Sequence, residues 1–390
     1  MLKSLLIKIV AKVVQFVGLI YRPRKQIEGV KTILLNKADR IGDAIVVLPF
    51  LLELKKYFQI TVLTTKRNNF IFEPFFKTEI ILEKPRYIYE EIMAIIEAFF
   101  MMFKKTSKSD SAYDLYLDLN GIRQADFLVK FRKEHKCRYY AGLNSGPFNI
   151  LLDYAHKSNS MLFSKKHILE TFQEIIKESL KVDIEIPDYI DLTSKMMKPE
   201  EITLKMPFIM INIAGAKNFR GPCVKLYTDI IKGLSAKKIN FLIIDELNRP
   251  NLKEFQDYLK DNTDRIMYID KDLSLWQLLY MASKSSLYVG ADSGITHFLS
   301  IPTNAVIFFG TGLPGVWRPY SKNIYIRKKN DEIIVEETKT SKGLIKKIIY
   351  KPVWCRPCFD IGCNKINCIR GLLNYEEAII KEIEEAITNG

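Results

Sequence analysis

The sequence predicts an α/β protein made of two doubly wound domains, each with its own parallel sheet. Its 390 residues exceed one ordinary domain and suit two. Short apolar runs alternate with stretches of helical periodicity, which is typical of a parallel sheet with helices on both faces. The alternation stops once, around residues 181–206, and then restarts. We therefore predict an N-terminal helical segment over 1–27, a first domain over 28–190 and a second domain over 205–390.

Apolar runs predict the strands, because a strand that is buried on both faces is continuously apolar. In the first domain, strands are expected at 32–35, 59–64 and 115–119, with helices over 43–57 and 92–103. In the second domain, strands are expected at 208–212, 240–244, 287–290 and 305–309, with a helix over 225–234. Parallel strands end at the same edge of a sheet, so we expect a ligand beyond their carboxyl ends, in a cleft between the domains.

The composition is that of a globular protein with a basic surface. Apolar residues make up 48% of the chain and charged residues 27%, which excludes a disordered or fibrous protein. Lysine and arginine number 59 against 45 acidic residues, a formal net charge of +14. Such an excess favours anionic partners, although a general lysine-rich bias would produce the same charge. No dense basic tract with interleaved aromatic residues is present, so no nucleic-acid partner is predicted.

The first twenty residues predict an amphipathic helix. Its apolar positions recur at helical spacing: Leu2, Leu5, Leu6, Ile9, Val10, Val13, Val14, Val17 and Ile20. Ser4, Lys8, Lys12 and Gln15 gather on the opposite side. The lysines favour a helix lying in a membrane interface over one that spans the bilayer, and packing against the protein's own body is the alternative. Because no small-residue cleavage site follows, we expect a cytoplasmic protein that is peripheral on the inner face of the cell membrane.

The first chemical motif is Asn-Lys-Ala-Asp-Arg-Ile-Gly-Asp at 36–43, which follows a predicted strand and opens a helix. Gly42 is expected to allow a tight turn there. Asp43 has two interpretations. It caps the helix, or its carboxylate takes a proton from a hydroxyl nucleophile in a cleft.

The second motif is Gly-Ala-Asp-Ser-Gly-Ile-Thr-His at 290–297, again between a strand and a helix. Its small residues let the backbone approach a ligand, and a pyrophosphate is expected at the N–H groups of Ser293, Gly294, Ile295 and Thr296. Asp292 either caps the helix or binds a sugar hydroxyl. His297 either donates to a phosphate or is a satisfied buried histidine.

Two further clusters are candidates. The loop from Asn212 to Arg220 follows a strand and contains Lys217, which either neutralises a diphosphate or is a solvated lysine. Four cysteines lie within fourteen residues and either bind a structural zinc ion or pack together as free thiols: Cys355, Cys358, Cys363 and Cys368.

The order and spacing of these motifs resemble glycosyltransferase family 9, the heptosyltransferase family of lipopolysaccharide core biosynthesis. The resemblance extends from about Lys31 to the C-terminus and includes the segments 113–121 and 309–320. It implies a GT-B fold, in which two Rossmann-like parallel-sheet domains face each other across a cleft. It also implies an inverting transfer that needs no metal cofactor.

Carried over by motif position, the resemblance assigns roles to residues of this chain. Asp43 would be the general base, and Lys217 would stabilise the departing nucleotide diphosphate. Glu246, shortly after a predicted strand, would contact the ribose or base. Donor binding would also involve Gly42, Asn212, Asp292, Ser293, Gly294, Ile295, Thr296 and His297.

The prediction is an inverting glycosyltransferase that moves a sugar, heptose from an ADP-heptose-like donor, onto a lipopolysaccharide-type or other lipid-linked saccharide. Ser293 and Ile295 depart from the family's usual residues, which leaves open a different nucleotide sugar. An alternative from another class is a zinc-stabilised nucleic-acid-binding protein, which explains the charge and the cysteines but neither of the two helix-start motifs.

Overall fold

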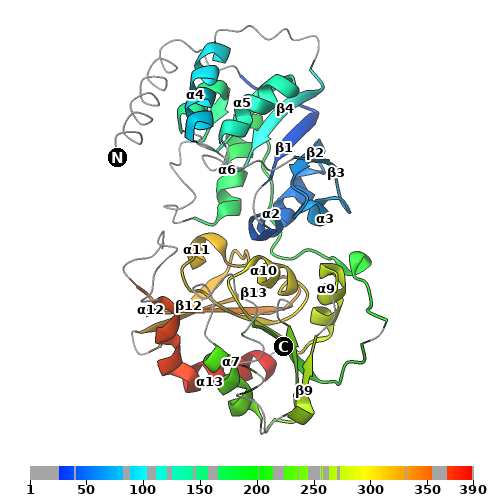
Figure 1. Ribbon diagram of the computed structural model, residues 1–390, viewed down its shortest axis with the longest axis vertical. Coiled ribbons are helices and arrows are strands. Elements are labelled where there is room, and N and C mark those ends of the chain that lie inside the picture. Colours follow the sequence, from blue (N-terminus) through cyan, green and yellow to red (C-terminus); the bar gives the residue numbers. More distant parts are fainter. Residues whose placement is uncertain are drawn as a thin grey trace. The chain divides into compact units, whose positions relative to one another are not determined.

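The computed structural model describes residues 26–38, 41–81, 88–102, 111–120, 125–143, 146–156, 166–200, 202–213, 224–235, 237–244, 255, 257, 263–269, 273–329, 332–353 and 367–388. The chain divides into two compact units, Met1–Ile186 and Pro187–Gly390. Each unit is built around its own sheet (Figure 1). None of the helices in these described ranges is long and apolar enough to cross a membrane.

The N-terminal unit holds sheet A, which is entirely parallel in the order β3-β2-β1-β4-β5-β6. Its strands are β1 (Thr32–Asn36), β2 (Gln59–Thr64), β3 (Lys77–Ile80), β4 (Tyr113–Asp118), β5 (Cys137–Gly142) and β6 (Tyr154–Ala155). The helical elements are α2 (Ile41–Leu54), α3 (Asn69–Phe72), α4 (Ile88–Met102), α5 (Ala125–Glu134), η3 (Gly146–Leu151) and α6 (Ile168–Leu180).

The C-terminal unit holds sheet B, in the order β12-β13-β14-β11-β10-β7-β8-β9. Its strands are β7 (Phe208–Asn212), β8 (Asn240–Ile244), β9 (Ile266–Tyr268), β10 (Leu287–Ala291), β11 (Ala305–Phe308), β12 (Ile324–Lys329), β13 (Ile333–Lys339) and β14 (Ile345–Tyr350). The helical elements are η4 (Thr193–Lys195), α7 (Val224–Leu234), η6 (Thr263–Arg265), α9 (Leu275–Lys284), α10 (Gly294–Leu299), α11 (Pro314–Trp317), α12 (Asn367–Arg370), η7 (Gly371–Tyr375) and α13 (Glu376–Thr388).

Both sheets have the strand order of a dinucleotide-binding fold. In sheet B, β9-β8-β7-β10-β11-β14 repeats the 3-2-1-4-5-6 order of sheet A. The predicted fold class is therefore confirmed, with one difference. Sheet B is mixed rather than purely parallel, because β12 and β13 add an antiparallel extension beyond β14. In β13, Ile333 and Val335 are buried while Ile334 and Glu337 are half-buried, which fits such an extension, since one face of an antiparallel sheet can meet solvent.

Continuous burial explains why the central strands form. Four of the five residues in β1 and all five in β7 and β10 are buried, so these apolar runs are covered on both faces. Helices α4 and α5 pack with η3 in the N-terminal unit, and their apolar sides join a core that includes Ile95, Ala98 and Leu128 (Figure 1). In the C-terminal unit, α7 and α13 pack together over the corresponding core.

Candidate functional site

The strand order reverses in each sheet, and polar groups gather at both reversals. In sheet A the reversal lies between β1 and β4, and in sheet B it lies between β7 and β10. In open α/β sheets, ligands bind outside the carboxyl ends of the strands at this switch point. The residues that follow β1, β4, β7 and β10 are therefore the candidates that the fold itself selects.

Asp43 lies just past the switch point of sheet A. It is the third residue of α2, which follows β1, and its side chain is half-buried. The helix begins at Ile41, so Asp43 belongs to the first turn and does not precede the helix as a cap would. Gly42 lies in the same turn with helical backbone. Among the described residues, the glycines with positive φ are Gly29 and Gly343, so Gly42 does not use a left-handed conformation.

Buried polar side chains support the same edge of sheet A. Asn36 ends β1 with its side chain fully buried, and its Oδ1 accepts a hydrogen bond from the Ala38 N–H at 3.3 Å. Tyr116 on β4 is also fully buried. Burial and the Asp118 carboxylate hold the pKa of Tyr116 well above its ordinary value, while the Asn36 side chain acts in the opposite direction.

The turn after β4 is closely packed. Asp118 Oδ1 accepts a hydrogen bond from the Asn120 N–H at 2.8 Å, and the Asp118 carbonyl accepts one from the Leu143 N–H at 2.9 Å. A Cβ on Gly142 would lie 2.3 Å from that carbonyl oxygen, so only glycine fits beside it. Lys37, directly after β1, is also buried, with its ammonium 5.5 Å from the centre of the Phe172 ring.

The switch point of sheet B is built around the hydroxyl of Tyr288. This phenol on β10 is fully buried and lies 3.1 Å from Thr296 Oγ1, which lies 3.0 Å from Ser293 Oγ. Burial raises the pKa of Tyr288, and the side chains of Thr296 and Asn212 oppose that rise by hydrogen bonding. A Cβ on Gly290 would lie 2.9 Å from both Thr296 Oγ1 and the Tyr288 hydroxyl, so Gly290 makes room for this contact.

Helix α10 is held at both ends. Ser293 is its N-cap, and Ser293 Oγ accepts a hydrogen bond from the Thr296 N–H at 3.3 Å. At the other end, the buried Lys346 ammonium donates to the carbonyls of Ser300 and Thr303. Burial lowers the pKa of Lys346 to about 7. The cap is thus Ser293, and the alternative that Asp292 caps this helix is wrong.

Asp292 and His297 form a pair within the same loop–helix unit. His297 Nε2 lies 3.2 Å from Asp292 Oδ1, and the imidazole is 8% exposed. A Cβ on Gly312 would lie 2.4 Å from the other Asp292 oxygen, so the 310–312 loop approaches this carboxylate closely. His297 is consequently nearly buried and paired with Asp292, and its contact with a phosphate stays a prediction.

The structure divides the predicted donor-binding residues into two groups. Asn212 and Thr296 are buried, so they brace the loop from inside. Asp292, Ser293, Gly294, Ile295 and His297 lie together from the end of β10 into α10. Lys217 and Glu246 lie outside the described residues.

Three of the four predicted metal ligands also lie outside the described residues: Cys355, Cys358 and Cys363. The fourth, Cys368, is buried in α12. Within the described ranges, no group of three or more histidine, cysteine and acidic side chains could hold a metal ion. The zinc prediction therefore stays a prediction.

Sequence reasoning missed Asn36, Tyr116 and Tyr288, and it named Asn212 only as a donor-binding residue. Asn36 and Tyr116 in sheet A correspond to Asn212 and Tyr288 in sheet B. A signal was present, because a tyrosine inside an otherwise apolar strand needs a partner for its hydroxyl. Only the strand pairing reveals that each tyrosine lies beside a strand that ends in an asparagine.

Comparison with solved structures identifies the fold. A glycosyl transferase family 9 protein from Veillonella parvula matches with a TM-score of 0.57 and 15% identity, covering 76% of this chain and 85% of that one. E. coli heptosyltransferase WaaC, solved with ADP-2-deoxy-2-fluoro heptose, matches with a TM-score of 0.56 and 14% identity over 91% of this chain and 99% of WaaC. No protein-family model and no curated protein match the sequence.

A third solved structure extends the comparison. The iron-containing dodecameric heptosyltransferase TibC from enterotoxigenic E. coli, in complex with ADP-D-β-D-heptose, matches with a TM-score of 0.52 and 11% identity. The match covers 93% of this chain and 78% of TibC. The chain therefore has the GT-B fold of glycosyltransferases. Within that class its fold is like that of the family 9 heptosyltransferases.

Proposed function

We propose that the protein is an inverting glycosyltransferase that moves heptose from an ADP-heptose-like donor onto a lipid-linked saccharide. One observation carries the proposal. Each sheet reverses its strand order beside one of the two sequence motifs, with Asp43 in the first turn of α2 and residues 292–297 at the end of β10. Solved proteins of this fold hold ADP-heptose or its fluoro analogue, which supports an ADP-sugar donor.

In this mechanism the N-terminal unit binds the acceptor and the C-terminal unit binds the donor. Asp43 accepts the proton of the acceptor hydroxyl as its oxygen attacks the anomeric carbon. The bond between that carbon and the diphosphate oxygen breaks from the opposite face, which inverts the anomeric configuration. Lys217 neutralises charge on the departing diphosphate.

The donor is held by the segment from Asp292 to His297. Small side chains at Ser293 and Gly294 let the backbone approach the phosphates, and the Asp292 carboxylate accepts hydrogen bonds from sugar hydroxyls. The buried side chains of Thr296 and Asn212 hold this segment in place through their interaction with the Tyr288 hydroxyl. Glu246 contacts the ribose or base. Catalysis needs no metal cofactor, and the terminal cysteine set binds a structural zinc ion.

The proposed acceptor also places the protein on the inner face of the cell membrane. The sequence of residues 1–20 supports this location, because it combines an apolar stripe with lysines on the opposite side. The net charge of +14 favours contact with anionic lipid.

A panel of nucleotide sugars tests the proposed donor. The unfolding temperature of the full chain is measured with ADP-heptose, other ADP-sugars, UDP-sugars and GDP-sugars, and the release of each nucleoside diphosphate is then followed with a saccharide acceptor. We expect stabilisation and turnover with ADP-heptose. A response to UDP- or GDP-sugars alone would assign another donor. Steeply salt-dependent oligonucleotide binding without any nucleotide-sugar response would overturn glycosyl transfer.

A further inference from the structure

Arg318 and Glu336 form an ion pair that is almost buried in the C-terminal unit. Arg318 Nη1 lies 3.5 Å from Glu336 Oε2, and the two side chains are only 12% and 6% exposed. The Tyr350 hydroxyl donates to the other Glu336 oxygen at 2.8 Å, which fixes the orientation of the carboxylate. A buried ion pair adds little net stability compared with apolar side chains in the same place, because both charges lose their water. Such a pair is better explained by the geometry that it fixes.

The pair joins two elements of the C-terminal unit. Arg318 ends α11, where its N–H donates to the Pro314 carbonyl at 2.9 Å and its Nη1 donates to the same oxygen at 3.4 Å. Glu336 lies in the middle of β13, with β12 on one side and β14 on the other. The neighbouring Val335 belongs to the core that includes α7 and α13, and successive side chains of a strand point to opposite faces. Glu336 therefore points to the other face of sheet B, where it meets the end of α11.

The segment that ends at Arg318 passes beside the donor motif. It begins after β11, where the Phe309 N–H donates to a carbonyl of β14 at 3.0 Å. A Cβ on Gly312 would lie 2.4 Å from Asp292 Oδ2, so the segment approaches this carboxylate closely. Segment 309–318 is thus held to sheet B by a backbone hydrogen bond at its start and by the ion pair at its end, and its middle lies against Asp292.

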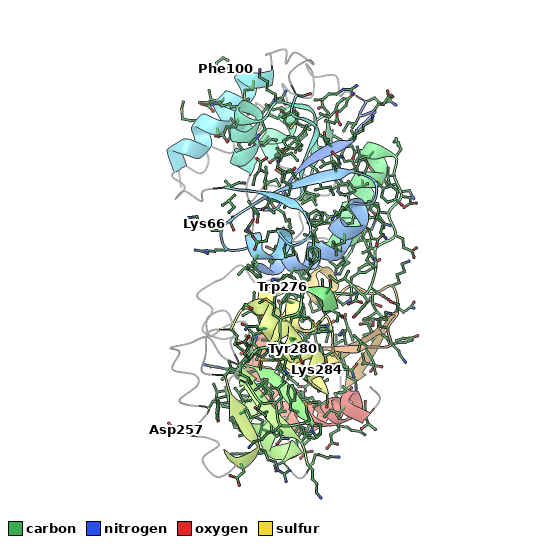
Figure 2. The ribbon with its side chains drawn as sticks, turned by 90° about the vertical axis from the view of Figure 1, so that its right-hand side faces the viewer. Lys66, Phe100, Asp257, Trp276, Tyr280 and Lys284 are labelled. Carbon is green, nitrogen blue, oxygen red and sulfur yellow. The ribbon has the colours of Figure 1, made fainter. Side chains whose placement is uncertain are left out.

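Helix α10 is held by other contacts. The Trp276 ring of α9 packs edge-on against Phe298, with the ring centres 5.1 Å apart (Figure 2). This contact fixes the helix, but Asp292 precedes the helix and its carboxylate needs support of its own. One carboxylate oxygen lies beside His297, and the other lies beside segment 309–318. The direction of the carboxylate therefore depends on where that segment lies.

We propose that Arg318 and Glu336 are positioning residues for the donor sugar. Their ion pair holds segment 309–318 in place, and the segment keeps the Asp292 carboxylate directed at the sugar hydroxyls. This inference rests on the proposed function, in which Asp292 binds the sugar of a nucleotide-sugar donor. It also gives the antiparallel extension of sheet B a role, because β13 supplies Glu336.

Calorimetric affinities of the full chain for ADP-heptose and for ADP test this inference. ADP lacks the transferred sugar, so a defect in positioning Asp292 weakens only the binding of the sugar nucleotide. In Glu336→Gln we expect the affinity for ADP-heptose to fall about tenfold and the affinity for ADP to stay unchanged. Equal losses for both ligands would mean that the pair is merely structural and would overturn the inference.

Glu382→Gln is the matched control. Glu382 of α13 is also buried and forms an ion pair of 2.7 Å with Lys347 of β14. Glu382 belongs to α13, and its change removes one buried carboxylate charge just as Glu336→Gln does. We expect this variant to keep the wild-type affinity for both ligands.

Variants of Arg318 separate the charge of the side chain from its bulk. Arg318→Met should show the same selective loss of affinity for ADP-heptose. Arg318→Lys keeps a positive charge opposite Glu336, so it should recover most of the loss. If the lysine variant binds ADP-heptose as weakly as the methionine variant, the charge is not what positions the segment, and the inference is overturned.

Hydrogen exchange, measured by mass spectrometry without any ligand, tests the first step alone. The N–H groups of residues 316–318 donate to carbonyls at the start of α11, so their exchange reports how firmly segment 309–318 is held. We expect them to exchange about tenfold faster in Glu336→Gln and at the wild-type rate in Glu382→Gln. The same rate in both variants would overturn the inference.

The outcomes separate this inference from the proposed function. Failure of the wild type to bind any nucleotide sugar would overturn the proposed function and, with it, the role of the pair in donor binding. If the wild type and Glu336→Gln bind ADP-heptose equally well, the proposed function stands and the positioning role alone is overturned.

Discussion

The two sheets have the same arrangement of side chains at the switch point, but different functional groups follow their strands. In sheet A, Tyr116 pairs in register with Leu34, and Asn36 lies two residues further along β1. In sheet B, Tyr288 pairs with Met210, and Asn212 lies two residues further along β7. A buried tyrosine and an asparagine therefore occupy equivalent places in the two units.

The difference lies in which strand carries the functional segment. In sheet A, the helix after the first strand carries the carboxylate of Asp43. In sheet B, the helix after the fourth strand begins with the hydroxyls of Ser293 and Thr296. A carboxylate suits proton transfer, whereas hydroxyls and small residues suit phosphate groups. In the proposed function, the strand order determines where each ligand binds, and the helix that follows determines which ligand it is.

Replacing Asp43 removes the carboxylate that distinguishes sheet A from sheet B. We expect the largest effect from this change. Asp43→Asn keeps the shape of the side chain but removes the general base, so kcat should fall by about 10²–10⁴-fold. Donor binding, measured by calorimetry, should stay unchanged because the donor segment lies in the other unit. Glu53→Gln, in the last turn of the same helix, is the matched control and should retain full activity. Full activity in Asp43→Asn would remove the assignment of Asp43 as base.

Two glycines compare the packing of the sheets: Gly142 ends β5 beside the end of β4, and Gly290 lies on β10 at the switch point of sheet B. In Gly142→Ala, the new Cβ meets a backbone carbonyl at 2.3 Å, whereas in Gly290→Ala it meets side-chain atoms, the nearest being two hydroxyls at 2.9 Å. Backbone yields less than side chains, so we expect Gly142→Ala to destabilise its unit by about 3 kcal/mol and Gly290→Ala by about 1 kcal/mol.

Urea unfolding distinguishes the two variants by unit. Trp276, Trp317 and Trp354 all belong to the C-terminal unit, so tryptophan fluorescence reports that unit and circular dichroism reports both. Gly142→Ala should change only the dichroism transition. Equal losses in the two variants would show that the surroundings of the two glycines are equally rigid.

Much of this design was predictable from the sequence, and the rest depended on strand pairing. Continuous apolar runs predicted β1, β7 and β10, because a strand that is covered on both faces is apolar along its whole length. Periodicity did not predict the antiparallel β12–β13 extension, since its sequence resembles any half-exposed strand. Asp43 stood out because its motif joins a strand to a helix. The roles of Asn36 and Tyr116 could not be predicted from the sequence, because they depend on contacts between residues about eighty positions apart.

The hydroxyl network of sheet B gives a smaller effect. Thr296→Val keeps the volume but leaves the buried Tyr288 hydroxyl without the partner it has at 3.1 Å, so we expect a loss of about 1–2 kcal/mol in the C-terminal unit. Tyr288→Phe with Thr296→Val removes both hydroxyls and should cost less than the sum of the single variants. Additive losses in this double-mutant cycle would mean that the two hydroxyls do not act together. Donor affinity should fall in parallel, because Thr296 also fixes Ser293.

The last comparison is between one buried lysine in each unit, and it gives the smallest expected effect. Lys37 in the N-terminal unit lies over an aromatic ring, whereas Lys346 in the C-terminal unit donates to carbonyls beyond α10. Burial lowers the pKa of Lys346 to about 7 from its ordinary value of 10.5. Between these values the unfolded chain binds more protons than the folded one, so the stability contribution of this group rises with pH.

Lys346→Met removes this dependence and tests it. The unfolding free energy of the wild type, measured by tryptophan fluorescence in urea, should rise relative to that of Lys346→Met by about 1 kcal/mol from pH 7 to pH 8. Well below pH 7 the difference should stay constant, because both states then carry the proton. Lys284→Met, which changes an exposed lysine on α9, should follow the wild type at every pH. Parallel profiles for the wild type and Lys346→Met would mean that the two carbonyls keep Lys346 protonated, and α10 would then be held by a buried charge.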